Sequence, residues 1–469
     1  MHLMNASATS RWLAALTLLL MGLAAGWLAG PAWGLALIIG ALVWLLAFSW
    51  PELALAALVA GFQLYPILFE VAGLHPTQLS SGIVYAILTS GAMMGTLLRN
   101  PRRAWRRMTR PAGVVFVLMS LYFVISWIAL TEKTPSSVQK MRYAVVIMIP
   151  SFLAALWLER TRIPRFAWFV VLFSALGALV GVTRRMLGLI PPEVKRLSLS
   201  TTSRSLQFAY SVGVGGLFSW VLARRGSRRA LAWATFFGSV TFLMIFAAGS
   251  RGAFLALLSS LLLFFFLSGQ WRRLPMLLLI GAFLAAVLLA PYFVIDQQQS
   301  TERIWGSIER GAALLTPFRA HPDATDAAAE ELDAGEEFAQ LTTQRTDYYR
   351  ASWEMLREHP WLGVGFGGYS FTNDKRQRYL YPHNYFLEIG SETGLIGLVL
   401  FCVFLGLALW RSANVLRHQP GVAGWVAVSM MVYAMIAGWV SYSMTYHAML
   451  WVSFGLALSL DDGRMERRS

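Results

Sequence analysis

The chain has 469 residues, of which 57% are hydrophobic and 13% are charged, and its mean hydropathy is +0.56. This composition is too apolar and too poor in charge for a water-soluble protein of this length, so it predicts a protein embedded in a lipid bilayer. The net charge of +15 would suit a nucleic-acid partner, but the arginines form short clusters between apolar runs, so no nucleic acid is expected.

Uncharged apolar runs recur along the chain, and several reach the roughly 17 to 20 residues that cross about 30 Å of hydrocarbon as a helix. The sequence therefore predicts an all-α polytopic membrane protein with about 12–14 transmembrane helices. The expected helices begin near residues 12, 32, 52, 79, 112, 142, 166, 207, 230, 253, 274, 385, 422 and 447. The first resembles a secretory signal peptide, but a second apolar run follows residues 29–32 directly, which favours a retained helix.

Clusters of arginine indicate the orientation of these helices. They lie at residues 99–110, 160–165, 224–229, 272–273 and 464–468. In the expected order of helices these are alternate loops, so the positive-inside rule places them and both termini in the cytoplasm. We expect a multi-pass protein of a bacterial inner membrane, with the other loops on the exported side.

The apolar runs and loops divide the chain into four parts. Residues 1–183 are N-terminal transmembrane helices, residues 184–293 are helices with a basic exported loop and a Ser-Arg-Gly turn, residues 294–384 are a long exported loop, and residues 385–469 are C-terminal transmembrane helices. The acidic, alanine-rich start of the long loop favours a solvated helix or a disordered strip. Its aromatic residues after position 344 suit the membrane interface.

The exported side holds unusual positive charge. The loop of residues 184–204 includes Arg196 and Arg204, and Arg251 lies in a turn between two very apolar helices. One interpretation is that the arginines at residues 184 and 185 snorkel from a helix end and that Arg251 caps the carbonyls of the preceding helix. The alternative is an anion site, because guanidinium groups bind phosphate oxygens in a bidentate way.

His383 is the strongest candidate for acid–base chemistry. Proline disfavours helix before it and Asn384 is a good N-cap, so a helix is expected to open near Tyr385 and to hold His383 at the bilayer surface. Glu388 and Glu392 lie one turn apart on one face of that helix, where carboxylates are costly unless they are partnered or wet. The imidazole titrates near neutral pH, and a neighbouring carboxylate orients it.

Two further segments are weaker candidates than His383. His447 is the reserve histidine, near another exported helix end. The glycine-dense residues 363–369 lack the Lys-Ser/Thr ending of a P-loop, so they indicate a tight turn with exposed backbone amides rather than a nucleotide site. Cys402 is the only cysteine, which leaves no disulfide framework and no thiolate metal site.

A basic pocket facing a histidine base is what transfer from a polyprenyl diphosphate requires. The arginines stabilise the leaving diphosphate, and the base activates the incoming hydroxyl. We assign Arg196, Arg251, Arg345 and Arg204 to the diphosphate and His383 and Glu388 to catalysis. Neither step demands a metal, and no cofactor is expected.

Residues 190–410 resemble the O-antigen ligase and polymerase superfamily, which is related to protein O-oligosaccharyltransferases. The resemblance is carried by Arg196-Leu-Ser, Ser250-Arg251-Gly252, Arg345 through Trp353 to His359-Pro-Trp-Leu-Gly-Val-Gly, and His383-Asn-Tyr-Phe-Leu-Glu with Glu-Thr-Gly-Leu-Ile-Gly. It implies a membrane-embedded, GT-C-like, inverting and metal-independent glycosyltransferase that acts on the periplasmic face. The sequence departs from the family at residues 202–205, where relatives often have an asparagine-rich turn, so Arg196 and Arg204 compete for the first diphosphate-binding role.

The implied donor is a glycan linked to undecaprenyl diphosphate. The favoured reaction is ligation of the glycan to lipid A core, ahead of polymerisation of lipid-linked repeat units and of transfer to a protein hydroxyl. A lipid-glycan flippase or transporter is a different class, which usually places charged or broken helices at the midplane in paired repeats. No such repeat is evident here, so glycan transfer is preferred to transport. Membrane lipids are expected to surround the protein.

Overall fold

The computed structural model describes residues 31–61, 64, 67, 78–187, 205–224, 228–248, 250–269, 333–369, 371–372, 378–379, 381–418, 421–440, 443–445 and 447–460. Within these residues the fold is helical except for one small hairpin, in which β1 (Phe371–Thr372) pairs antiparallel with β2 (Arg378–Tyr379). The expectation of an all-α membrane protein is confirmed.

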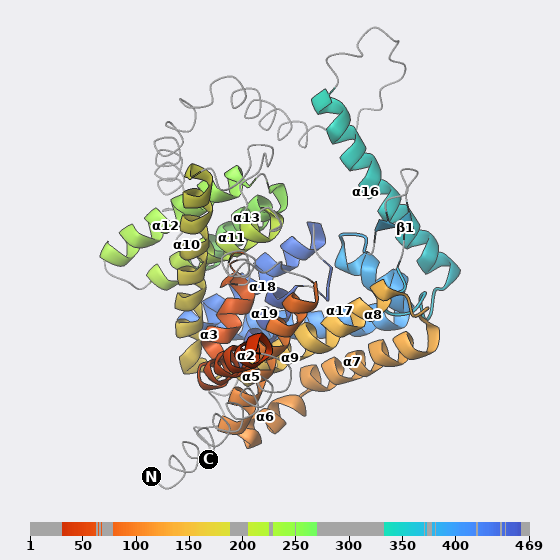
Figure 1. Ribbon diagram of the computed structural model, residues 1–469, viewed down its shortest axis with the longest axis horizontal. Coiled ribbons are helices and arrows are strands. Elements are labelled where there is room, and N and C mark those ends of the chain that lie inside the picture. The colour runs from red at the N-terminus through yellow and green to blue at the C-terminus, as the bar shows by residue number, and fades with distance from the viewer. Residues whose placement is uncertain are drawn as a thin grey trace.

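The helices follow the expected apolar runs closely (Figure 1). In the N-terminal part they are α2 (Pro31–Ser49), α3 (Pro51–Ala56), η1 (Ala57–Gly61), α5 (Gln78–Arg99), α6 (Pro101–Met108), α7 (Pro111–Leu130), α8 (Pro135–Tyr143), η3 (Ala144–Met148), α9 (Ile149–Trp157), η4 (Arg160–Arg162) and α10 (Ile163–Met186). The remainder are α11 (Ser205–Ala223), α12 (Arg228–Ala247), α13 (Arg251–Leu267), α16 (Asp333–Glu358), α17 (Tyr385–His418), α18 (Val422–Val440) and α19 (Ala448–Ser459).

Six of the described helices are long and apolar enough to cross a membrane, or seven if one bent pair counts as a single span. Shorter apolar helices lie within α11, α12, α13 and α19. The chain is therefore a multi-pass membrane protein. The helices expected near residues 12 and 274 lie outside the described residues, so a total of 12–14 for the whole chain stays a prediction.

Proline begins several of these helices, because a ring with fixed φ and no N–H suits the first helical position. Helices α3, α6, α7 and α8 each start at a proline. The α8 helix opens seven residues before the predicted position 142, because Thr134 caps it: its Oγ1 accepts from Ser137 N at 3.2 Å. A polar first turn thus precedes the apolar run that defined the prediction.

The segments expected to begin near residues 32 and 52 form a sharply bent pair rather than two equal spans. The stretches Ile38–Ser49 and Pro51–Gly61 meet at an angle of 108°. Pro51 has no N–H to donate to the preceding turn, so the helix cannot continue through it. The second arm is also short, because it turns into the π-helical η1 after Ala56.

Arginines fasten several helix ends together at what we call the basic end, formed by α6 and residues 156–162. Arg107 is 2% exposed and donates to Leu156 O at 2.6 Å, to Leu158 O at 3.1 Å and to Ser459 O at 2.7 Å. Carbonyls at the C-termini of α9 and α19 have no intrahelical partner, so a buried guanidinium satisfies them well. Arg162 adds an ion pair with Glu52, with Nη1 to Oε1 at 3.0 Å.

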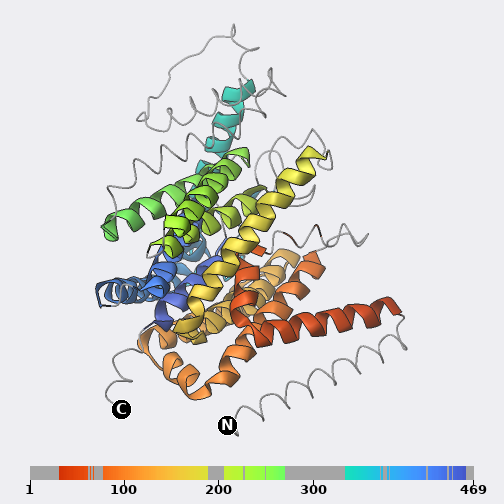
Figure 2. The ribbon, with the colours of Figure 1, turned by 90° about the vertical axis from the view of Figure 1, so that its left-hand side faces the viewer.

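Helix α7 leads from the basic end to the opposite end of the molecule, along the lower edge of Figure 1. There Thr131 Oγ1 donates to Phe366 O at 2.9 Å, which joins the end of α7 to the glycine-dense turn. We call this the His383 end, formed by residues 131–140, 363–369 and 383–393. Figure 2 shows α10, in yellow, running beside the green helices of residues 205–267. That these two ends face opposite sides of a membrane stays a prediction.

Candidate functional site

His383 occupies a strained position immediately before α17. Its φ is 57°, and it is the only non-glycine residue with positive φ in the part of the chain that the structure describes. Histidine is among the residues that tolerate this left-handed region, together with asparagine and aspartate. The half-buried ring lies 4.5 Å from that of Tyr381 and 6.0 Å from that of Tyr348 in α16, measured between centroids. Backbone strain of this kind clusters at functional sites.

Asn384 fixes the start of α17 as the sequence predicted. Its Oδ1 accepts from Phe386 N at 3.0 Å and from Leu387 N at 3.2 Å, which satisfies two of the helix's unpaired amides. The helix begins at Tyr385. The cap therefore sets the direction in which the chain leaves His383.

A buried ion cluster lies beneath the first turns of α17. Lys140 Nζ lies 2.5 Å from Glu388 Oε1 and 2.5 Å from Glu392 Oε1, and the three side chains are 3%, 0% and 1% exposed. The prediction that the two carboxylates share one face of a helix is confirmed. Burial of ionised groups is tolerated only when they are paired and hydrogen-bonded, and one ammonium here faces two carboxylates.

Three further donors complete this cluster. Glu388 accepts from Ser443 Oγ at 2.6 Å and from Met444 N at 3.0 Å, while Glu392 accepts from Gly367 N at 2.9 Å. The cluster thus joins α8, the first part of α17, the glycine-dense turn and residues 443–444, which lie between α18 and α19. Both carboxylate oxygens of Glu388 are occupied by contacts within the protein. Such contacts suit a residue that positions the start of α17 rather than one that contacts a substrate.

The glycine-dense turn is tight, as predicted, and it docks against a break in α17. Gly394 has φ 63° and ψ −166° inside the helix, which only glycine adopts without strain. The amides freed by this break find new acceptors, because Leu395 N donates to Pro360 O at 2.8 Å and Ile396 N to Trp361 O at 3.3 Å. In return, Val364 N donates to Ser391 O at 3.0 Å. The amide of Gly367 serves the protein's own carboxylate, so this turn is part of the scaffold.

The break explains the length of α17. Its 34 residues would extend about 50 Å as one helix, against roughly 30 Å of hydrocarbon. Division at Gly394 leaves a second part of sufficient length to cross the bilayer and a short first part that carries Glu388 and Glu392. Irregular backbone at such a position is tolerated where it is buried in protein.

His447, the reserve candidate, is buried next to the first residue of α17. Its Nδ1 forms a hydrogen bond with Tyr385 Oη, and the ring is buried among the helices. A Cβ added at Gly438 would collide with the Tyr385 ring, so α18 is shaped to receive it. His447 therefore supports Tyr385, the second residue after His383.

The predicted diphosphate ligands are only partly described. Arg251 is the first residue of α13, after the cap Ser250, whose Oγ accepts from Ala253 N at 3.3 Å. Arg345 lies in α16, one turn before Tyr348, so the backbone carrying it belongs to the helix that packs against His383. The side chains of both arginines, and the whole of Arg196 and Arg204, lie outside the described residues. Their roles stay predictions.

Lys140 was missed by the sequence reasoning, although a signal existed. Carboxylates inside a membrane helix need a cationic partner, and Lys140 lies in a loop that the predicted topology puts on the same side as Glu388. It sits beside an apolar run, where it looks like an ordinary flanking charge. Among the described residues no three His, Cys, Asp or Glu side chains gather as metal ligands.

Comparison with known proteins gives one match. Residues 234–402 match a family model described as O-antigen ligase, a range that includes most of α12, all of α13 and α16, and α17 past its break. The sequence matches none of the curated proteins significantly.

Proposed function

Because residues 234–402 form an O-antigen ligase family domain in a multi-pass membrane protein, we propose that this chain transfers a glycan from undecaprenyl diphosphate to a hydroxyl acceptor. Enzymes of this family are glycosyltransferases of the O-antigen ligase and polymerase type. The favoured acceptor is lipid A core. Polymerisation of lipid-linked repeat units is the second candidate, since the family includes both reactions, and transfer to a protein hydroxyl is the third.

The observation that carries the proposal is the conformation of His383 inside that domain. A strained histidine close to two tyrosine rings is followed by a capped helix whose first turns rest on a buried ion cluster. Such preorganisation suits a base that removes the proton of the acceptor hydroxyl as the oxygen attacks the sugar carbon. The bond to diphosphate breaks in the same step, with inversion at that carbon and without a metal.

The remaining roles follow from charge. Arg251 and Arg345, with Arg196 or Arg204, bind the diphosphate and stabilise the charge that develops on it as it leaves. Glu388 acts on His383 by holding the start of α17, which makes it a positioning residue. The active site faces the periplasm of the inner membrane, because the arginine clusters hold the basic end in the cytoplasm.

Purified His383→Asn protein tests the central assignment. Asparagine also tolerates positive φ, so this variant removes the base while it preserves the backbone. We expect transfer to fall about 10²- to 10⁴-fold, the usual contribution of a general base. The assay supplies undecaprenyl diphosphate glycan with lipid A core, with a second lipid-linked unit, or with neither.

The control is His418→Asn, an exposed histidine at the other end of α17, which should retain full activity. Glycan on the core indicates a ligase, and a ladder of longer lipid-linked glycan indicates a polymerase. Wild-type rates in His383→Asn would refute the role of His383, and failure of the wild type with both acceptors would leave protein glycosylation or transport.

A further inference from the structure

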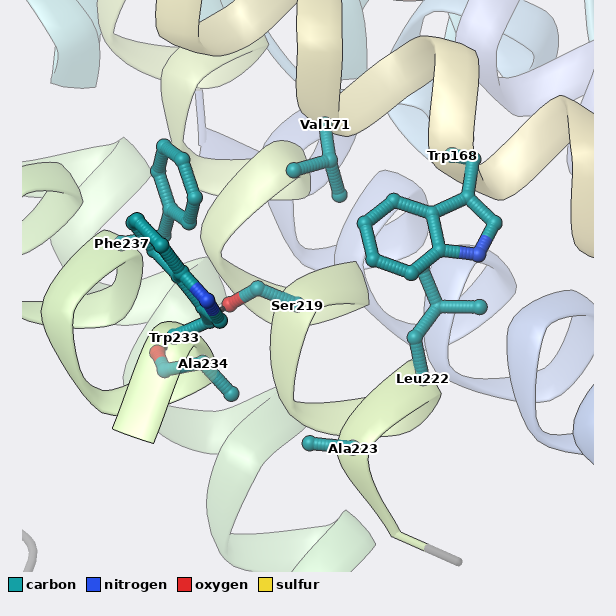
Figure 3. A pocket seen from close by; sticks show the side chains of 8 residues that line it. All are labelled: Trp168, Val171, Ser219, Leu222, Ala223, Trp233, Ala234 and Phe237. Carbon is teal, nitrogen blue, oxygen red and sulfur yellow. Dashed lines mark hydrogen bonds between the residues drawn. The ribbon is translucent and has the colours of Figure 1, made fainter. Parts of the chain in front are cut away.

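A cavity of about 490 Å³ opens between α10, α11 and α12, away from the His383 end (Figure 3). Its volume falls in the range of roughly 300–1,000 Å³ that is usual for ligand sites. Its lining consists of Trp168, Val171, Ser219, Leu222, Ala223, Trp233, Ala234 and Phe237. The site described above uses none of these residues.

The wall of this cavity suits a hydrocarbon chain. Ser219 is the one polar aliphatic side chain in it, and its hydroxyl donates within the protein, to Gly216 O at 2.7 Å. The two indoles are open to the surroundings, with Trp168 60% exposed and Trp233 58% exposed. A polar ligand would find few partners here, whereas an acyl chain would cover the apolar wall and both indoles.

The position of the cavity along the helices places it near a membrane surface. It is lined by the early residues of α10 and α12 and by the last residues of α11, and these helix ends belong to segments with arginine clusters. Trp is enriched at the level of lipid headgroups, where its ring is apolar and its N–H is wet. The cavity therefore opens between the hydrocarbon and the headgroups.

Positive charge lies beside each indole. Arg165 precedes Trp168 by three residues in α10, and Arg229 precedes Trp233 by four residues in α12, so each pair is adjacent on its helix surface. Both arginines are exposed and lie closer to the helix starts than the indoles do. Basic pockets between transmembrane helices bind the head groups of anionic lipids.

We propose that this cavity is a binding site for an anionic phospholipid, with one acyl chain between α10, α11 and α12 and the phosphate against Arg165 and Arg229. The site is separate from the glycan-transfer chemistry. Its acyl chain fills the gap that the apolar side chains of these three helices leave at this level.

Native mass spectrometry of the purified chain with added phosphatidylglycerol or phosphatidylcholine tests this site. We expect the wild type to retain phosphatidylglycerol preferentially. The double variant Arg165→Gln/Arg229→Gln should bind it about 20- to 30-fold more weakly, because each basic residue near an anionic headgroup contributes a factor of about five. Trp233→Ala should lower retention of both lipids, and since Trp233 is largely exposed the variant should still fold.

Matched controls separate this site from general lipid adhesion. Arg102→Gln/Arg106→Gln removes two exposed charges from α6, and Trp410→Ala removes an equally exposed indole from α17, so both should bind as the wild type does. Equal retention of the two lipids, or equal losses in the control variants, would overturn the proposal. Preferential retention of added undecaprenyl phosphate, lost in Trp233→Ala, would also overturn it, because the occupant would then be a polyprenyl chain.

Discussion

At the scale of single residues, the stability of the buried cluster depends on the positive charge of Lys140. One ammonium faces the carboxylates of Glu388 and Glu392, and all three side chains are shielded from solvent. Replacing such a pair by apolar groups is often harmless, whereas removing one partner leaves an uncompensated buried charge. The stability of the site should therefore depend more on Lys140 than on either carboxylate.

We expect Lys140→Met to destabilise the protein by about 3–5 kcal/mol, because two carboxylates lose the only cationic partner that the described residues give them. Thermal unfolding in detergent measures the effect. Adding Glu388→Gln and Glu392→Gln to Lys140→Met should recover part of the loss, since the charges then disappear together. The control Lys133→Met changes an exposed lysine of the same loop, whose hydrogen bonds to carbonyls at the end of α7 are accessible to solvent, so it should cost far less than Lys140→Met. Equal losses in both variants would contradict the cluster's importance.

At the scale of elements, α17 depends on one glycine for its shape. The break at Gly394 exists because that residue adopts φ 63° and ψ −166°, and because the turn of residues 359–364 supplies replacement hydrogen bonds. A Cβ at this position would collide with the carbonyl of Trp361. The break and the turn are therefore one structural unit.

We expect Gly394→Ala to lower the unfolding temperature and to reduce transfer, since the strained backbone alone costs about 1–3 kcal/mol and the collision separates the turn from the helix. Gly406→Ala is a matched control in the same helix, where an added methyl meets nothing within 4 Å. Alanine there should be neutral or slightly stabilising. An unfolding temperature for Gly394→Ala that matches this control would show that the break tolerates a side chain.

At the scale of the whole molecule, the two ends of the helices should face opposite sides of the membrane. In a Cys402→Ala background, we expect His359→Cys to react with a membrane-impermeant maleimide in spheroplasts and Thr109→Cys to react only after permeabilisation. Both positions are exposed, and they lie at the His383 end and the basic end respectively. The opposite pattern would show that the protein has the inverse orientation. Labelling of both positions in unpermeabilised spheroplasts would contradict the prediction that the two ends face opposite sides of the membrane.

Features that depend on residues close together in the chain could be predicted from the sequence, whereas contacts between distant residues could not. Helix starts such as Tyr385 follow from caps, prolines and apolar runs, which act within a few residues, so they were predicted closely. The contact between Lys140 and Glu392 joins positions 252 residues apart, and no local rule specifies it. The break at Gly394 could not be predicted for the same reason, because the hydrogen bonds that stabilise it are made with a turn that is distant in the chain. The catalytic and diphosphate-binding roles stay predictions at every scale.

The guanidinium of Arg107 has a consequence for biosynthesis. Two of its carbonyl acceptors come from residues 156 and 158, but another, Ser459 O, belongs to the last described helix and is 352 residues away. During translation the ribosome releases that acceptor only after α18 has been made. A chain that stops before α19 keeps a buried cation with an incomplete set of partners, so it should be less stable than the full chain.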